Sequence, residues 1–183
     1  MSQGILLYGP PASGKDTITT VLCEHNQSYS AFKRLKIGSG RTDGYRMGTS
    51  DQLVELEARG DVIYRNDRYG NIYLVDRQGL VQTMQDGSVP ILHLGQVAGL
   101  EAVVARFPAS WSSVLLWCSR ESTAVRSKGR GDSDTEARLA AWEATAQDLE
   151  ASSDFGWDLR LDTDAVSPTE AAQEIDRLIR HGI

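Results

Sequence analysis

The stretch GILLYGPPASGKDT, residues 4–17, decides the fold of this 183-residue chain. Its apolar first part ends at Gly-Pro-Pro and predicts a buried strand, and a helical pattern begins near Lys15. Between them lies the spacing G-x-x-x-x-G-K, which is typical of loops whose backbone N–H groups surround a phosphate. The helix N-terminus adds partial positive charge, and the lysine adds a compact cation. We therefore predict a nucleotide-phosphate loop made by Gly9, Ala12, Ser13, Gly14, Lys15, Asp16 and Thr17.

Asp16 stands where such loops usually carry a Ser or Thr hydroxyl that reaches magnesium. Its carboxylate could hold Mg²⁺ directly or through water, because oxygen ligands suit that ion. It could equally be no more than a favourable residue at a helix start, where the dipole prefers negative charge. Thr17 offers a hydroxyl one residue further on. Asp16 and Thr17 are therefore the candidate metal ligands.

Apolar runs alternate with helical patterns along the rest of the chain. This alternation predicts an α/β fold with a parallel sheet covered on both faces, the three-layer sandwich of P-loop NTPases. The strands are expected near residues 4–8, 89–94, 112–118 and 157–162.

The chain is expected to form one domain over residues 1–183. Its core is predicted at residues 1–30 and 88–183, with a small acceptor-binding insertion at about 31–87. Residues 31–48 are rich in Gly, Lys and Arg without a clear period, so no regular element is predicted there. The charged, Gly-containing segment 126–137 predicts a mobile lid.

The composition is that of an ordinary soluble protein, with a net charge of −6 and a pI near 5.1. These values argue against nucleic-acid or anionic-membrane partners. The N-terminus lacks a basic region, and no apolar run approaches 18 residues, so we expect a cytoplasmic protein without a membrane span. Cys23 and Cys118 are predicted to be reduced, buried thiols. The oligomeric state stays open.

The segment AVRSKGRGDSDTEARL, residues 124–139, adds a second motif. With the loop, it makes the chain resemble the guanylate kinase-like branch of the nucleoside monophosphate kinase fold over nearly its whole length. That family has an arginine, then Arg-Gly four residues later, then Arg-Leu at the next helix, which fall on Arg126, Arg130 and Arg138. The resemblance implies that these arginines close over ATP, and planar guanidinium groups suit phosphate oxygens. The alternative is a solvated charged loop and helix face.

The variant SGKDT, residues 13–17, resembles in particular the loop of ribose 1,5-bisphosphate phosphokinases, in which Lys is also followed by Asp and a hydroxyl residue. Asp162-Thr163-Asp164 resembles the turn beside the adenine in guanylate kinases, although that match is short.

The acceptor region carries a third resemblance, in the stretches DGYRMGTSDQLVELEARGDVI (43–63) and DRYGNIYLV (67–75). It implies that Tyr45 and Tyr69 bind the acceptor phosphate, and a phenol can donate to such a phosphate. The family's Thr-Thr-Arg-x-x-Arg is replaced by FKRLKIGSGRTDGY. The available cations are Lys33, Arg34, Lys36 and Arg41, of which Arg34 and Arg41 are preferred.

The sequence departs from guanylate kinases where the base is read. The family uses carboxylates at positions that fall here on Tyr64, His93 and Gly95. A site built to hydrogen-bond its substrate loses heavily when those partners are missing, so a GMP-specific acceptor site is not expected. His93 ends a predicted strand, where ligands of α/β proteins sit, and is placed at the acceptor; it could also be a hydrogen-bonded core residue.

These features lead to one hypothesis with three alternatives. The chain is expected to be an ATP- and Mg²⁺-dependent kinase that transfers the γ-phosphoryl group to a small phosphorylated acceptor, nucleoside-monophosphate-kinase-like but not GMP-specific. The alternatives are a ribose 1,5-bisphosphate phosphokinase, a kinase of a metabolite hydroxyl, and a non-catalytic interaction module, although such modules generally lose the phosphate loop. Lys15, Arg130 and Arg138 are the expected catalytic residues, and Arg126 joins the loop in ATP binding.

Overall fold

Strand β1 (Gln3–Tyr8) lies at the centre of a five-stranded sheet in the computed structural model, which describes residues 2–68, 70–129 and 135–181. Every pairing in this sheet is parallel. The four predicted strands are confirmed, and a short fifth strand, β2, was not predicted. The order is β2 (Tyr29–Ala31), β7 (Val89–Leu94), β1, β8 (Ser110–Trp117) and β9 (Leu159–Asp162).

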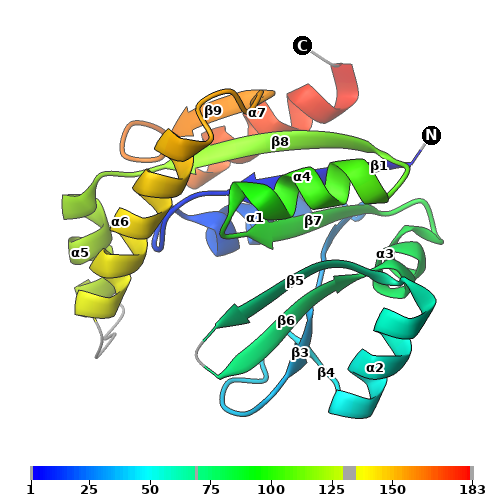
Figure 1. The fold of residues 1–183 in the computed structure, drawn as a ribbon. Coiled ribbons are helices and arrows are strands. Elements are labelled where there is room, and N and C mark those ends of the chain that lie inside the picture. The colour runs from blue at the N-terminus through cyan, green and yellow to red at the C-terminus, as the bar shows by residue number, and fades with distance from the viewer. Residues whose placement is uncertain (1, 69, 130–134, 182–183) are drawn as a thin grey trace.

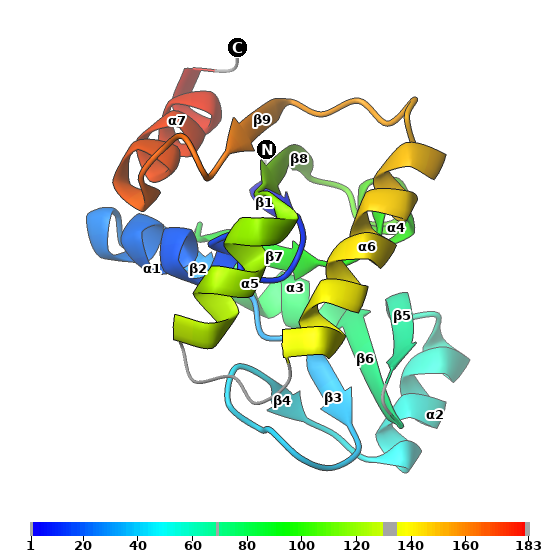
Figure 2. The ribbon, with the colours of Figure 1, turned by 90° about the vertical axis from the view of Figure 1, so that its left-hand side faces the viewer.

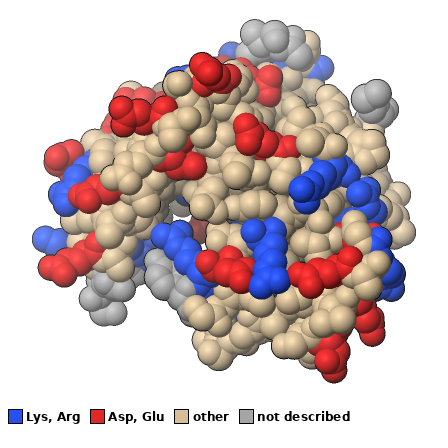
Figure 3. All heavy atoms as spheres, in the orientation of Figure 1, with Lys and Arg blue, Asp and Glu red and all other residues tan. Residues whose placement is uncertain are grey.

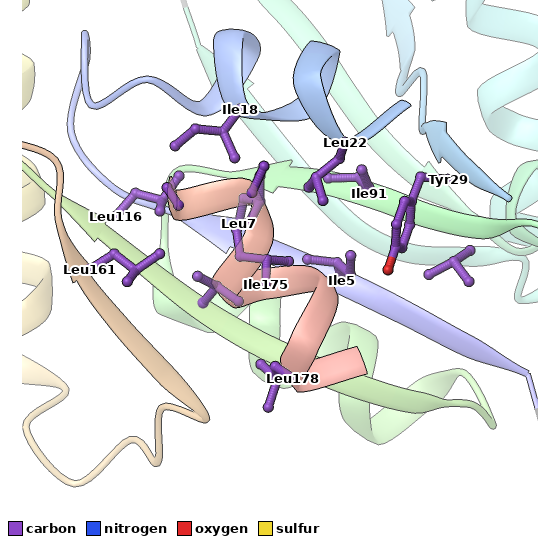
Figure 4. Close-up of a cluster of buried hydrophobic side chains, with 14 residues drawn as sticks. Ile5, Leu7, Ile18, Leu22, Tyr29, Ile91, Leu116, Leu161, Ile175 and Leu178 are labelled. Carbon is purple, nitrogen blue, oxygen red and sulfur yellow. The ribbon is translucent and has the colours of Figure 1, made fainter. Parts of the chain in front are cut away.

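The apolar run in β1 covers both faces of this sheet because side chains alternate along a strand. Ile5 and Leu7 pack on the face covered by α1 (Lys15–His25) and α7 (Pro168–His181), as Figure 4 shows. Leu6 and Tyr8 pack on the opposite face, under α4 (Val97–Arg106). Helices therefore cover both faces of the sheet, which confirms the predicted three-layer α/β sandwich.

A second sheet lies below the first in Figure 1. It joins β4 (Arg46–Met47), β3 (Leu35–Ile37), β6 (Asn71–Asp76) and β5 (Val62–Arg68) in that order. The chain also forms α2 (Ser50–Arg59) before β5 and α3 (Arg77–Met84) after β6. Sequence patterns missed β3 and β4, since strands of two or three residues are too short to show a period.

The two faces of the second sheet have different roles. Leu35, Ile37 and Leu74 form a small core with Leu53 and Leu56 of α2. The alternate positions of β3 and β6 place Lys36 and Tyr73 opposite each other on the other face.

Asp76 joins the second sheet to the start of α3. Its carboxylate forms an ion pair with Arg46 and accepts a hydrogen bond from the N–H of Gly79 at 2.8 Å. The buried carboxylate thus has partners on both sides, as buried charges require.

Helices α5 (Arg120–Gly129) and α6 (Thr135–Ala151) lie side by side in Figure 2. The predicted lid is therefore helical at both ends, since 126–129 belong to α5 and 135–137 to α6. Helix α5 continues through Arg126 because the sequence brings its first Gly only at position 129. Residues 130–134, with Arg130, lie outside the described part of the chain.

Two smaller predictions have separate outcomes. Both cysteines are free thiols, but only Cys118 is buried, while Cys23 is partly exposed on α1. Across the described residues, no helix combines the length and apolar character that a membrane crossing needs.

Leu100 and Val104, both on α4, test how far the sheet depends on this helix. Leu100 is fully buried, whereas Val104 is 51% exposed. We expect Leu100→Ala to lower the free energy of unfolding by about 3 kcal/mol, because it leaves a cavity in the core. Val104→Ala should change it by less than about 0.5 kcal/mol. Urea denaturation measures both, and equal losses would contradict this packing.

Candidate active site

The loop between β1 and α1 takes a backbone path that its glycines permit. A Cβ on Gly9 would lie 2.0 Å from the carbonyl oxygen of Leu116, so no other residue fits there without a shift. Gly14 caps α1 with φ 87°, and Ala12 also has a positive φ of 61°. A non-glycine residue in this region carries strain of roughly 1–3 kcal/mol, and such strain clusters at functional sites. The predicted phosphate loop is thus a curled loop at the carboxyl end of the central strand.

Lys15 lies folded over this loop. Its Nζ donates to the carbonyl oxygens of Gly9 at 2.7 Å and Pro10 at 2.8 Å, and to Oγ of Ser13 at 3.2 Å. Burial lowers the pKa of the Lys15 ammonium to about 8, partly opposed by the negative charge of Asp16. The lysine therefore sits where an incoming phosphate can replace carbonyl oxygens as its partner.

A cavity of about 270 Å³ lies beside the loop, next to α5 and the turn after β9. Arg126 of α5 donates to the carbonyl oxygens of Ala12 at 3.1 Å and Thr163 at 2.7 Å. It also donates to the Asp164 carboxylate at 3.0 Å. Arg126 therefore ties α5 to the loop and to the predicted adenine-side turn. The cavity is lined by Ala12, Gly14, Thr17, Ile18, Arg126, Thr163, Val166 and Pro168.

A second pocket, of about 380 Å³, lies between α1, the end of β7 and the segment 31–45. We call it the cationic pocket, because three basic side chains line it in a protein of net charge −6. Figure 3 shows the surface hollowed between the parts that carry the two sheets, with charged side chains beside the hollow. The polar residues of the pocket are Asp16, Thr19, Thr20, Lys33, Arg34, Arg41, Asp43, Tyr45 and His93.

Two tyrosine rings lie next to Arg34, and one of them, Tyr45, lines the cationic pocket. The guanidinium carbon of Arg34 lies 5.9 Å from the ring centre of Tyr45 and 5.3 Å from that of Tyr73, within cation–π range. The two rings are 5.3 Å apart. Sequence reasoning missed Tyr73, although the alternation in NIYLV places it on the face opposite Ile72 and Leu74.

Lys36 differs from the other predicted cations because it is only 2% exposed. Its Nζ donates to the carbonyl oxygens of Ser39 at 2.7 Å and Arg41 at 2.8 Å. It therefore holds the turn that carries Arg41 and does not line the pocket. Arg34, Arg41, Tyr45 and His93, all predicted from sequence, are brought together at the pocket.

Asp16, His93 and Thr19 form a chain of contacts on one wall of the cationic pocket. His93 Nε2 is 2.7 Å from the Thr19 hydroxyl, and its Nδ1 is 3.4 Å from the Asp16 carboxylate. The contact with His93 lowers the pKa of the Asp16 carboxyl to about 2, against the raising effect of burial. The arrangement fits the tautomer in which Nδ1–H faces the carboxylate and Nε2 accepts from the hydroxyl.

Tyr64 lies where the second sheet meets the start of α4. Its hydroxyl donates to the Gln96 amide oxygen at 2.5 Å, and burial raises the pKa of the phenol. The ring packs so closely on Gly99 that a Cβ there would meet it at 2.9 Å. Tyr64 is not among the residues that line the cationic pocket, and it forms a neutral pair with Gln96 at the position expected to lack the family's carboxylate.

Three further predicted site residues are Arg138, Tyr69 and Arg130. Arg138 lies half-buried in the first turns of α6, next to α5. Tyr69 and Arg130 lie outside the described residues. The Trp142 indole N–H donates to the carbonyl oxygen of Cys118 at 2.9 Å, which holds α6 against the end of β8.

Several known proteins with similar chains are named guanylate kinases. A guanylate kinase from Trichormus variabilis is 28% identical over 156 residues, which is 82% of this chain and 78% of the relative. One from Trichodesmium erythraeum is 24% identical over 182 residues, covering 97% and 95%. The solved guanylate kinase from Anaplasma phagocytophilum matches with a TM-score of 0.68 at 18% identity, covering 98% and 85%. No family model matches.

The similarity of the chain to guanylate kinases over most of its length supports a guanylate kinase-like P-loop kinase. The resemblance stated from its motifs is therefore confirmed, as is the prediction of a phosphotransferase enzyme. The alternative of a non-catalytic interaction module is not favoured.

The lowered pKa of Lys15 predicts how nucleotide binding by this kinase depends on pH. A lysine whose pKa is about 8 loses its charge as the pH rises through that value. We expect the affinity for MgATP to be constant below pH 7 and to fall above pH 8, by up to about tenfold per pH unit. Titration calorimetry from pH 6.5 to 9.5 measures it. Lys15→Arg, which stays protonated, should lose this fall; a constant wild-type affinity up to pH 9.5 would contradict the assignment.

Proposed function

We propose that this kinase transfers the γ-phosphoryl group of ATP to the phosphate of a small phosphorylated acceptor. The observation that carries the proposal is the shared wall between the loop and the cationic pocket. Asp16 belongs to the first turn after the loop and also lines that pocket, together with Arg34 and Arg41. A donor phosphate on the loop and an acceptor phosphate on the arginines would thus lie at one junction, and alignment of this kind supplies much of phosphoryl-transfer catalysis.

On the donor side, the loop amides and Lys15 bind the phosphates of ATP. The ammonium leaves the carbonyl oxygens of Gly9 and Pro10 and bridges the outer phosphates. Arg126 lines the adjacent cavity, in which the adenosine part of ATP would bind. Arg130 and Arg138 are proposed to stabilise the charge that spreads over the transferring phosphoryl oxygens.

The donor set at the start of α1 fits Mg²⁺. Thr17 offers a hydroxyl beside the cavity of Arg126, and Asp16 offers a carboxylate on the side of the cationic pocket; both are oxygen donors. The described residues contain no cluster of three or more His, Cys, Asp or Glu side chains suited to a metal ion. That combination suits an ion that keeps several waters and is held largely by substrate phosphates. When bound, the ion would neutralise charge on the nucleotide phosphates.

On the acceptor side, Arg34 and Arg41 bind the acceptor phosphate, with Tyr45 and Tyr69 as hydrogen-bond donors. An ionised oxygen of that phosphate attacks the γ-phosphorus while the bond to the ADP oxygen breaks. No general base is needed, because the attacking oxygen carries no proton. The charges that neutralise both anions come from this chain's own Lys and Arg side chains.

The acceptor is proposed to be a nucleotide-type phosphate that is not restricted to GMP. The names of the relatives make GMP the first compound to test. Support for a wider range comes from Tyr64, which stands where the family has a carboxylate and whose hydroxyl is paired with Gln96. A neutral pair lacks the charge that favours the N–H groups of guanine. Ribose 1,5-bisphosphate belongs in the same test because of the SGKDT loop. The cytoplasmic location stays a prediction.

ADP release tests this function. With wild-type protein, MgATP and a panel of all nucleoside monophosphates and ribose 1,5-bisphosphate, we expect acceptor-dependent ADP formation. Lys15→Ala should lower kcat/KM by at least about 100-fold, because an interaction with the transferring phosphoryl is lost. Lys128→Ala, an exposed lysine on α5, is the matched control and should change it less than about twofold. Acceptor-dependent ADP formation by Lys15→Ala at the wild-type rate would contradict the proposal.

The same panel tests the acceptor range. We expect kcat/KM for GMP to exceed that of the next acceptor by no more than about tenfold, and Tyr64→Glu to raise this ratio, since a carboxylate can accept from guanine. Tyr64→Gln, which is neutral, is the control. A wild-type preference for GMP above about 100-fold would overturn this part.

A further inference from the structure

The two candidate metal ligands of the loop line different cavities. Thr17 lines the cavity beside Arg126, on the donor side. Asp16 lines the cationic pocket, and its side chain is 82% exposed there. The residue that breaks the usual loop pattern is therefore part of the acceptor side of the site.

His93 fixes the direction of this carboxylate. One ring nitrogen lies 3.4 Å from the Asp16 carboxylate, and the other lies 2.7 Å from the buried Thr19 hydroxyl. With partners on both sides, the imidazole ring cannot turn without losing one of them. An exposed aspartate carboxyl is ordinarily ionised at neutral pH.

A fixed negative charge is at first sight misplaced in a pocket for phosphate. Asp43, the other carboxylate of the pocket, forms an ion pair with Arg41 at 3.5 Å. Asp16 instead contacts an imidazole, and its exposed carboxylate oxygens act purely as hydrogen-bond acceptors. A carboxylate beside a phosphate site repels free phosphate. It can accept a hydrogen bond from the hydroxyl group of a phosphate ester that carries one.

We propose that Asp16 and His93 form a hydroxyl-binding subsite of the acceptor pocket. Asp16 accepts a hydrogen bond from a hydroxyl of the acceptor, whose phosphate lies on Arg34 and Arg41, and His93 is a positioning residue for that carboxylate. The acceptor is then a phosphate ester of a polyol, as in a sugar phosphate or the sugar part of a nucleotide. This inference rests on the proposed acceptor pocket but does not depend on metal or on turnover.

A minimal pair of ligands isolates the subsite. Glycerol 3-phosphate and propyl phosphate share a three-carbon chain and one phosphate, and differ in two hydroxyl groups. Binding to the full chain is measured by titration calorimetry or ligand-observed NMR without nucleotide or divalent cation. We expect wild-type protein to bind glycerol 3-phosphate about tenfold more tightly, the scale of one hydrogen bond to a charged group.

Variants assign this preference to the proposed residues. Asp16→Ser should abolish the preference and bind propyl phosphate as tightly as wild type or more so, because a repulsive charge is gone. His93→Ala should reduce the preference, and His93→Asn should restore part of it, since an amide can still donate to Asp16. Asp43→Asn, the matched control, should shift both esters equally and keep the preference. Circular dichroism melting verifies that each variant is folded.

The outcomes separate this inference from the proposed function. Equal binding of both esters by wild type, or a preference that Asp16→Ser leaves intact, overturns the subsite even if ADP release succeeds. If neither ester binds to wild type, the acceptor pocket fails and the subsite fails with it. A preference that depends on Asp16 without acceptor-dependent ADP formation supports the subsite and counts against the kinase reaction.

Discussion

The site depends on the close approach of Gly9 to the carbonyl oxygen of Leu116. A side chain at position 9 would have to occupy a point 2.0 Å from that oxygen, so the chain can pass from β1 into the loop only through glycine. This contact lets the loop turn beside the end of β8 and start α1 with its N–H groups exposed. Helix α5 is fixed to the same loop, since the Thr123 hydroxyl donates to the carbonyl oxygen of Pro11 at 3.1 Å. The cavity beside Arg126, the loop and α5 therefore meet at one place.

Charge is arranged locally against the overall balance of the protein. A chain of net charge −6 repels phosphate at long range, yet it gathers Lys33, Arg34 and Arg41 at one pocket. Part of this arrangement is indirect, because buried Lys36 uses its ammonium to hold the turn beneath Arg41. The acidic groups nearby are each engaged, Asp43 with Arg41 and Asp16 with His93. On the proposal above, such a pocket would select a phosphate whose molecule also carries a hydroxyl group for the exposed oxygens of Asp16.

The sequence was most informative where a signal is local. The apolar run of β1, the loop spacing and the alternation of strands and helices predicted the main sheet and the loop, because each depends on neighbouring residues. It was silent on β2, β3 and β4, which are held by pairing with distant strands and not by their own pattern. Tyr73 was missed for the same reason, since its role depends on lying opposite Lys36.

The contacts that define the site join residues far apart in the chain, so no spacing could reveal them. Thr19 and His93 are separated by 74 positions, and Arg126 meets the loop across 114. Asp16 was recognised as unusual from the sequence. Its place in the cationic pocket beside His93 depends on the pairing of β7 with β1, which the sequence does not show. The burial of Cys23 was likewise overestimated, because the sequence pattern of a helix does not show how completely its neighbours cover a given side chain.

We propose that the loop binds the phosphates of the donor nucleotide and that the cationic pocket binds the acceptor phosphate of the same reaction. A crystal structure of the protein with ADP and inorganic phosphate tests it most directly. We expect the β-phosphate of ADP within hydrogen-bond distance of Lys15 and the loop amides, with a separate phosphate on Arg34 and Arg41. ADP bound away from the loop, or a cationic pocket that stays without phosphate at saturating concentration, would contradict it.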